Sequence, residues 1–368
     1  MTSDRLVRVF PHAEPSDFRP APALSRERLV GLFAHMLFCR VLDEKMLGMQ
    51  RQGRIGFYGP GNGQEASVTG SASAFEKSDW IFPALREGAA LLLRGFPLEK
   101  YIAQTIGNAL DVSKGRQMPC HFSSGPHKFL SLSSVIGTQI PQAVGAAMAA
   151  KIRGDKTVVG GYLGDGATSS TDFHAAMNFA GVFKAPVVLV CQNNQWAISV
   201  PFSMQTASKG VAIKARAYGF EGVAVDGNDI LAVYAVAKAA VDKARAGNGP
   251  TLIECVTYRR GGHSSSDDPT RYRKEGATAA WLLEDPVDRY RVWLKANHAW
   301  TDAEEEAIKE SARRTIDLAI KAAEAAPLPT PGSMFDDVYG EIPEDIARQR
   351  DLCLGTLDGG KNEGAFPL

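Results

Sequence analysis

Two short polar motifs in the middle of the chain offer oxygen ligands of the kind that bind a metal ion. The first, Gly164-Asp165-Gly166, supplies a carboxylate, and the second, Asn193-Asn194, supplies carboxamide oxygens. Mg²⁺ prefers such hard ligands and completes its octahedral shell with phosphate oxygens and water. A Gly-Asp-Gly sequence alone is a common turn, so its meaning depends on the elements that position it.

The residues around these motifs have the pattern of a strand, a helix and a second strand. Residues 158–163 and 187–190 are apolar runs typical of buried strands. Ser170 or Thr171 is expected to cap the intervening helix. Its apolar residues, at helical spacing, are Phe173, Ala176, Met177, Ala180 and Phe183. Such a unit joins parallel strands by a right-handed crossover. Both motifs then lie beyond the carboxyl ends of strands, beside a helix N-terminus, which predicts a magnesium–diphosphate site.

Dinucleotide binding is the alternative for a strand-helix-strand unit. Residues 161–166 do not form the GxGxxG pattern, and no Walker lysine follows them. A nicotinamide-dependent dehydrogenase is therefore disfavoured.

Strands alternate with helices through the centre of the chain, which predicts an α/β fold with a doubly wound parallel sheet. Further strands are expected at residues 80–83, 222–226 and 251–257. Residues 1–24 are rich in proline and polar groups and are expected to form an extended arm that buries little of the core. One α/β domain is expected over residues 25–330, beginning with a helical extension, and residues 331–368 are expected to form a helical tail.

Composition excludes several classes of protein. Lys+Arg and Asp+Glu both number 41 in the 368 residues, so no charge excess indicates nucleic acid or an anionic membrane as a partner. No apolar run approaches the length of a membrane span. The first residues lack the apolar core of a signal peptide and contain acidic residues, unlike a transit peptide. The five scattered cysteines form no CxxC motif, and we expect a cytoplasmic protein without structural zinc.

Two polar segments without a clear period are candidate functional loops. They are residues 111–137 and residues 258–273, and the second contains His263. Between the first loop and the central motifs, residues 138–153 predict a helix whose small residues suit close packing, either in the core or at a subunit contact.

Several motifs together resemble the alpha subunit of the decarboxylating component of 2-oxo acid dehydrogenases. The spacing of Gly164-Asp165-Gly166 and Asn193-Asn194 is similar to the thiamin diphosphate motif. The more specific matches are GRQMPCH (115–121), SSVIGTQIPQAVGAA (133–147), NNQWAISVP (193–201), VDGND (225–229) and YRRGGHSSSDDPTRYR (258–273). The pair Asp267-Asp268 and the segment WLLEDPVDRYRVWL (281–294) are most similar to the branched-chain type.

The resemblance implies thiamin diphosphate and Mg²⁺ as cofactors and assigns roles to single positions. Asp165, Asn194 and the Trp196 carbonyl would bind Mg²⁺, and Arg86 and His263 would meet the diphosphate or the reacting centre. The other implied cofactor contacts are Ser134, Ile136, Gly164, Gly166, Ala167 and Ile198. Val135, Thr138 and Gln139 match a loop that binds a monovalent cation in relatives, so K⁺ is also implied.

His263 and His121 are the candidate catalytic residues, because the histidine pKa lies near neutrality. The sequence departs from the family at two positions close to these residues. Leu85 stands where relatives often have tyrosine, and Gln192 stands where many have a charged residue. One hydrogen bond and one charge contact to the diphosphate are therefore supplied otherwise or are missing.

The implied reaction is oxidative decarboxylation of a branched 2-oxo acid, with the acyl group passed to lipoamide on a partner acyltransferase. Thiamin diphosphate supplies the carbon nucleophile and the electron sink. In this family the pyrimidine-binding half of the site belongs to a beta subunit, so the resemblance implies an α2β2 heterotetramer. Relatives in mitochondria are phosphorylated at a position that matches Ser264, and a phosphate there would add negative charge beside an anionic substrate. A substrate loop that is ordered by the cofactor is the simpler interpretation and is favoured.

Two rival functions remain open. The first is the same chemistry on pyruvate or acetoin. The second is a scaffold subunit that keeps the fold without the chemistry, which the presence of Arg86, Asp165, Asn194 and His263 disfavours.

Overall fold

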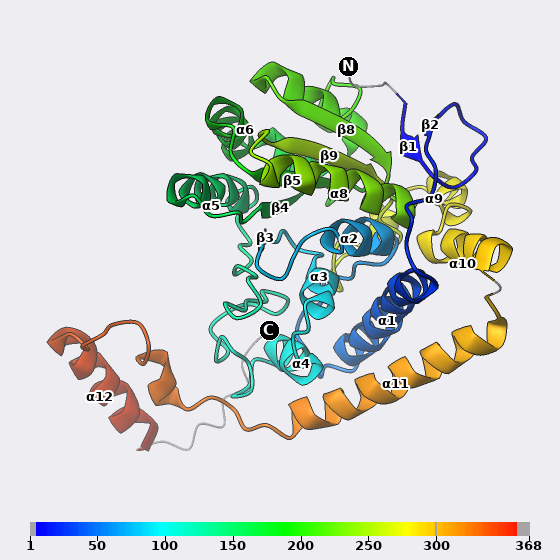
Figure 1. Cartoon of the computed structure of the whole chain (residues 1–368). Helices are drawn as coiled ribbons and strands as arrows, with labels where there is room; N and C mark the ends of the chain where they lie inside the picture. The colour runs from blue at the N-terminus through cyan, green and yellow to red at the C-terminus, as the bar shows by residue number, and fades with distance from the viewer. Residues whose placement is uncertain (1–4, 299, 359–368) are drawn as a thin grey trace.

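A computed structural model describes residues 5–298 and 300–358 (Figure 1). Its centre is a seven-stranded sheet in the order β2-β1-β8-β9-β5-β4-β3, and all its paired strands are parallel. The strands are β1 (Val7–Arg8), β2 (Asp17–Phe18), β3 (Trp80–Phe82), β4 (Val159–Gly164), β5 (Val187–Asn193), β8 (Glu221–Asp226) and β9 (Thr251–Val256). The predicted α/β fold with a parallel sheet is confirmed.

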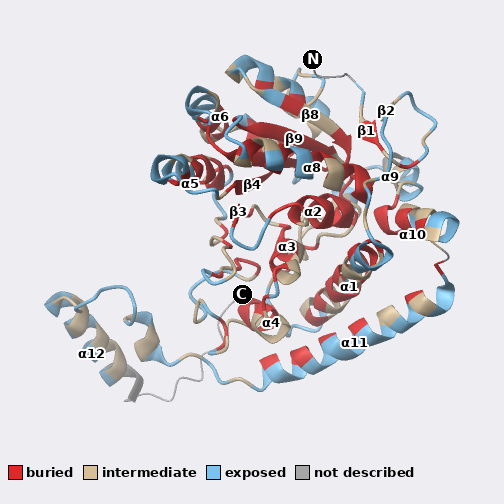
Figure 2. Cartoon of the chain, in the orientation of Figure 1, coloured by how far each residue is buried: buried red, intermediate tan, exposed pale blue. Residues whose placement is uncertain are grey.

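Helices cover both faces of the sheet, because β5 is buried along its whole length and needs apolar partners on each side. Val187, Leu189 and Cys191 face α5 (Gln139–Arg153) and α6 (Thr171–Phe183). Val188 and Val190 belong to the opposite core with α2 (Glu65–Ala72) and α8 (Ile230–Arg245). Figure 2 shows the buried residues concentrated in these central strands and in α2.

Helix starts follow the side chains that the sequence provides as caps. Ser25 caps α1 (Arg26–Arg51) by accepting a hydrogen bond from the Arg28 N–H, and Thr301 with Glu304 forms the expected capping box of α11 (Asp302–Glu324). Of the two candidates for α6, Ser170 is the cap, and its Oγ accepts from the Phe173 N–H at 3.2 Å. This cap fixes where the helix begins beside the Asp165 turn.

The first residues depart from the expectation of an arm that buries little of the core. Val7 and Phe10 are each only 3% exposed, and β1 adds to the sheet beside β8. The Val9 and Phe10 N–H groups donate to Asp229, and the Arg8 guanidinium donates to Asp226 at 2.9 Å. The expectation was wrong here because a two-residue strand has no period, and its sheet neighbour β8 and the carboxylates of Asp226 and Asp229 lie more than two hundred residues away.

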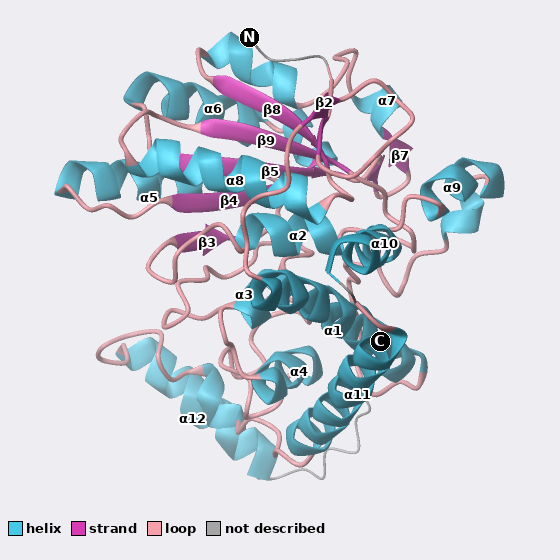
Figure 3. Cartoon of the chain, turned by 45° about the vertical axis from the view of Figure 1, so that its right-hand side comes forward, coloured by secondary structure: helices cyan, strands magenta, loops and turns pink. Residues whose placement is uncertain are grey.

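The remaining elements complete the layer around the sheet and the tail (Figure 3). They are α3 (Gly88–Leu93), α4 (Leu98–Ile106), η1 (Asp165–Ser169), β6 (Trp196–Ala197), β7 (Val200–Pro201), α7 (Phe202–Gln205), η2 (Ala212–Tyr218), η3 (Pro269–Arg271), α9 (Glu275–Leu282), α10 (Pro286–His298), η4 (Pro331–Met334) and α12 (Glu344–Asp358). In Figures 1 and 3, α12 lies away from the sheet. Within the described residues, no helix combines the length and apolarity that crossing a bilayer requires.

Candidate functional site

A cleft of about 460 Å³ opens at the carboxyl edge of β4 and β5. It gathers all the expected cofactor residues, which come from segments far apart in the sequence: Arg86, Ser134, Ile136, Gly164, Asp165, Gly166, Ala167, Asn194, Trp196, Ile198 and His263. His121 and Gln139 line it as well. The parallel sheet accounts for this convergence, because its strands deliver their following loops to the same edge.

Asp165 is the first residue after β4 and begins η1. Its side chain is 1% exposed, and one carboxylate oxygen, Oδ2, accepts a hydrogen bond from Gln205 Nε2 at 2.8 Å. Burial raises the pKa of Asp165, and the Gln205 hydrogen bond opposes that rise. A buried carboxylate of this kind is stabilised by a cation beside it.

Asn194 follows β5, and its amide is held at both ends. Nδ2 donates to Gln64 Oε1 at 3.0 Å, while Oδ1 accepts from the Trp196 N–H at 3.2 Å. Gln195 between them has a φ of 73°, which reverses the chain into the short β6–β7 hairpin. The Asn194 oxygen and the Trp196 backbone thus lie in one tight turn.

The backbone of Gly166 approaches the hairpin so closely that a side chain would not fit. A Cβ at Gly166 would come within 2.7 Å of the Ala197 Cβ. Ile198, further along the hairpin, has a φ of 53°, which is an outlier for a β-branched residue. Its carbonyl accepts a hydrogen bond from Arg259 Nη2 at 2.7 Å, and this contact holds the strained residue at the wall of the cleft.

The donor set suits magnesium better than a transition metal. In the described part of the chain, no three His, Cys, Asp or Glu side chains cluster as a metal site. A cation beside Asp165 would therefore take one carboxylate, amide and carbonyl oxygens, and oxygens from a ligand or water, as Mg²⁺ does.

Arg86 and His263 lie together across the cleft, on loops that are joined by direct contacts. Arg86 Nη2 donates to the His263 carbonyl at 2.8 Å, and Nη1 donates to the Pro60 carbonyl. Burial, with the nearby Arg259, lowers the pKa of Arg86 to about 10. The buried Arg86 guanidinium, with Arg259 nearby, makes the cleft a suitable site for an anion such as a diphosphate.

His263 differs from the expectation of a histidine that titrates near neutrality. Burial and the charges of Arg86 and Arg259 lower its pKa to about 4. The Asp267 carboxylate accepts from the His263 backbone N–H at 2.5 Å, so it anchors the loop and only partly offsets those charges. In the protein without ligand, His263 is therefore neutral at physiological pH.

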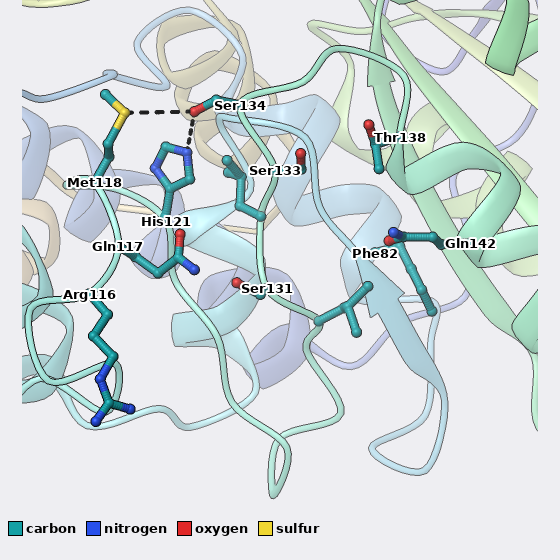
Figure 4. A pocket seen from close by; sticks show the side chains of 12 residues that line it. Phe82, Arg116, Gln117, Met118, His121, Ser131, Ser133, Ser134, Thr138 and Gln142 are labelled. Carbon is teal, nitrogen blue, oxygen red and sulfur yellow. Dashed lines mark hydrogen bonds between the residues drawn. The ribbon is translucent and has the colours of Figure 1, made fainter. Parts of the chain in front are cut away.

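His121 is buried and is oriented by hydrogen bonds at both ring nitrogens. Nδ1 lies 3.1 Å from the Pro119 carbonyl, which can only accept, so Nδ1 carries the proton. Nε2 then accepts from the Ser134 hydroxyl at 2.5 Å. Figure 4 shows this pair at the rim of a second, open groove of about 720 Å³, next to Met118.

Of the three residues implied for K⁺, Gln139 lines the cleft, whereas Val135 and Thr138 do not. The Val135 side chain is 68% exposed, and its carbonyl accepts from the Thr138 N–H at 3.4 Å. Thr138 lines the open groove, whereas Gln139 Nε2 donates to the Tyr162 carbonyl. The K⁺ site stays a prediction.

The two family departures lie at the site. Leu85 lines the cleft, and Gln192 donates a hydrogen bond to the Glu87 carboxylate. Burial raises the pKa of Glu87 to about 7.

Sequence reasoning missed other residues of the cleft: Phe57, Gln64, Glu87, Met118 and Leu132. The structure places Gln64 at the N-cap of α2. Its role toward Asn194 depends on a contact across 130 residues and has no local signal in the sequence.

Comparison with known proteins agrees with the fold. The model of the family described as "Dehydrogenase E1 component" matches residues 34–332. The chain is 41% identical to the mitochondrial 2-oxoisovalerate dehydrogenase subunit alpha of Homo sapiens, over 91% of this chain and 76% of that protein. It is 42% identical to the pyruvate dehydrogenase E1 component subunit alpha of Staphylococcus aureus, over 90% of this chain and 87% of that protein. The chain belongs to the dehydrogenase E1 component family of thiamin diphosphate-dependent enzymes and is similar throughout to its alpha subunits.

Proposed function

We propose that the protein is the alpha subunit of a branched-chain 2-oxo acid dehydrogenase decarboxylating component. The observation that carries this proposal is the single cleft that unites Arg86, Asp165, Asn194 and His263. These residues combine oxygen ligands with the Arg86 guanidinium and a neutral imidazole, which suits a metal-bound diphosphate.

The residues of the cleft fit thiamin diphosphate with Mg²⁺. Asp165, the Asn194 side-chain oxygen and the Trp196 carbonyl would hold the metal ion. Arg86 and His263 would meet the diphosphate, while Gly164, Gly166 and Ala167 let the backbone approach it. Ser134, Ile136 and Ile198 would border the rest of the cofactor, which supplies the nucleophilic carbon and the electron sink. Asp165 supports this assignment, because its carboxylate is buried and the Gln205 hydrogen bond only partly offsets the effect of burial on its pKa.

The two histidines would act on protons at the reacting centre. His263 is neutral in the free cleft, so it can accept a proton, and a bound dianion would raise its pKa toward neutrality. His121, with Nδ1 protonated toward Pro119, presents Nε2 to the Ser134 hydroxyl and can exchange a proton there.

The wall of the cleft supports a branched aliphatic substrate. Phe57, Leu85, Met118, Leu132 and Ile136 contribute apolar side chains to the lining. Carbon dioxide release from 3-methyl-2-oxobutanoate, pyruvate and acetoin, measured with the beta subunit present, tests this choice. We expect the highest kcat/KM with 3-methyl-2-oxobutanoate, and a preference for pyruvate would refute the branched-chain assignment.

The pyruvate alternative has one observation in its favour, because a pyruvate dehydrogenase alpha subunit is as similar in sequence as the 2-oxoisovalerate relatives are. Acetoin and a scaffold subunit without chemistry are weaker rivals. Calorimetry of thiamin diphosphate with Mg²⁺ separates the scaffold: Asp165→Ala should abolish binding, and equal binding by both forms would favour the scaffold.

We further propose an α2β2 heterotetramer with a beta subunit, serving a lipoyl-bearing acyltransferase. The relatives are themselves named as alpha subunits. Decarboxylation by the isolated chain would refute the need for a beta subunit. A K⁺ site at Val135, Thr138 and Gln139, a cytoplasmic location and the charge effect of a Ser264 phosphate belong to the same proposal. All five cysteines are free, which is typical of proteins in a reducing compartment.

The charge effect of a phosphate at Ser264 is tested by the variant Ser264→Glu, which should impair turnover.

A further inference from the structure

Gln64 occupies an unusual position for a buried amide. It is the N-cap residue of α2, yet its side chain makes no capping hydrogen bond to that helix. The side chain is fully buried and lines the cleft. Oε1 accepts from Asn194 Nδ2 at 3.0 Å, while Nε2 has no hydrogen-bond partner in the described part of the chain. A buried amide whose oxygen is hydrogen-bonded and whose nitrogen has no partner among the described residues requires an explanation.

The committed end decides which way the Asn194 amide faces. An asparagine amide has an oxygen and a nitrogen of nearly equal size, and only the oxygen can bind a cation. Because Gln64 Oε1 accepts from Nδ2, the Asn194 oxygen is held on the opposite side, where it also accepts from the Trp196 N–H. The reversed amide would place two N–H donors toward the cation and lose both contacts.

Gln64 is itself well anchored. Its N–H donates to the Gly61 carbonyl at 2.9 Å, and its carbonyl accepts from the Val68 N–H at 3.2 Å. The next residue, Glu65, is buried and forms an ion pair with Arg40. The side chain of Gln64 thus starts from a fixed point and can impose an orientation on Asn194 instead of adapting to it.

We propose that Gln64 is a positioning residue for the metal site: its Oε1 fixes the Asn194 amide with the oxygen toward the cation. This inference rests on the proposed function, because it presumes that Asn194 binds Mg²⁺ beside a diphosphate. Gln64 lies at the start of α2, outside the two motifs that supply the ligands. The role needs an acceptor at position 64 and does not need the free Nε2 donor.

Two substitutions separate the acceptor from the donor. Gln64→Glu keeps an oxygen for Asn194 Nδ2 and removes the donor, whereas Gln64→Met keeps the length and removes both. Thr69→Val is the matched control, since it removes a buried polar atom of the same helix that has no partner among the described residues. The melting temperature of each variant without cofactor reports on folding.

The measurement is the Mg²⁺ dissociation constant, obtained by calorimetry on the assembled alpha and beta subunits with saturating thiamin diphosphate. Gln64→Met should weaken Mg²⁺ binding about 10- to 100-fold, the usual effect of losing a residue that orients a ligand. Gln64→Glu and Thr69→Val should stay within about threefold of wild type or bind more tightly. In an Asn194→Asp background, where either side-chain oxygen can bind the cation, Gln64→Met should raise the Mg²⁺ dissociation constant much less than it does in the wild-type background.

Unchanged Mg²⁺ affinity in Gln64→Met would overturn the inference while leaving the proposed function intact. Equal losses in Gln64→Glu and Gln64→Met would also overturn it, since the donor would then be the active group. An undiminished loss from Gln64→Met in the Asn194→Asp background would show that Gln64 does not act through Asn194. Failure of the wild-type assembly to bind thiamin diphosphate would instead refute the proposed function, and the inference with it.

Discussion

Tyr58→Phe removes one hydroxyl from the buried network behind the cleft. The Tyr58 hydroxyl donates to Asp43 Oδ1 at 2.7 Å, and the other oxygen of Asp43 accepts from the Gly61 N–H at 2.8 Å. Both side chains are buried. The same loop carries the Pro60 carbonyl that contacts Arg86, and the Tyr58 N–H donates to Ser265 Oγ in the loop of His263. The hydroxyl therefore stabilises the loop that holds Arg86 and contacts the loop of His263.

The size of the effect depends on the charge of Asp43. Burial raises the pKa of Asp43 to about 7, and the Tyr58 hydrogen bond opposes this rise. Above that pH the hydroxyl bonds to a carboxylate, and we expect Tyr58→Phe to lower the free energy of unfolding by about 1.5–3 kcal/mol. Below pH 6 the acid is neutral, and the expected loss is about 0.5–1.5 kcal/mol.

The sign follows from proton linkage. The folded-state pKa of Asp43 lies above its unfolded value, so wild-type stability falls as pH rises toward 7 and then levels off. Without the hydroxyl the folded-state pKa is higher still, so the decline continues above pH 7 in the variant. The difference between variant and wild type should therefore grow between pH 6 and pH 9.

Urea unfolding at pH 6 and pH 9 measures this difference, with Tyr339→Phe, a change at a half-exposed tyrosine, as control. The control should leave the midpoint unchanged at both pH values. A Tyr58→Phe loss that is equal at the two pH values, or larger at pH 6, would refute the assignment of a charge-dependent bond.

Three further predictions concern the cleft. His263 should titrate near pH 4 in the cofactor-free protein and at higher pH with thiamin diphosphate bound, and an NMR midpoint near 6.5 without cofactor would contradict its burial between two guanidinium groups. Gln205→Met should weaken Mg²⁺ binding about 10-fold in calorimetry, because Asp165 loses its half-buried hydrogen-bond donor, and unchanged affinity would count against that role. Gln192→Arg should tighten thiamin diphosphate binding by pairing with Glu87 and adding a cation, and weaker binding in a folded variant would contradict it.

Much of the framework could be predicted from the sequence because its signals are local. The apolar runs at residues 158–163 and 187–190, with the helical spacing between them, indicated β4, α6 and β5, and Ser170 indicated a helix start. Because parallel strands carry their following loops to the same edge of a sheet, Asp165 was expected to lie near Asn194. The strands at one edge of the sheet, β1 and β2, were not predicted, because each has only two residues and shows no period.

The sequence by itself determined the parallel α/β architecture and the family, because periodicity, caps and motif spacing are properties of neighbouring residues. Only the tertiary structure decided how the proposed ligands are held and charged. Gln64 turns the Asn194 amide, and burial together with the charges of Arg86 and Arg259 lowers the pKa of His263 to about 4, through contacts between segments far apart in the chain. Burial and long-range hydrogen bonds set orientation and charge, and both arise only when the chain is folded.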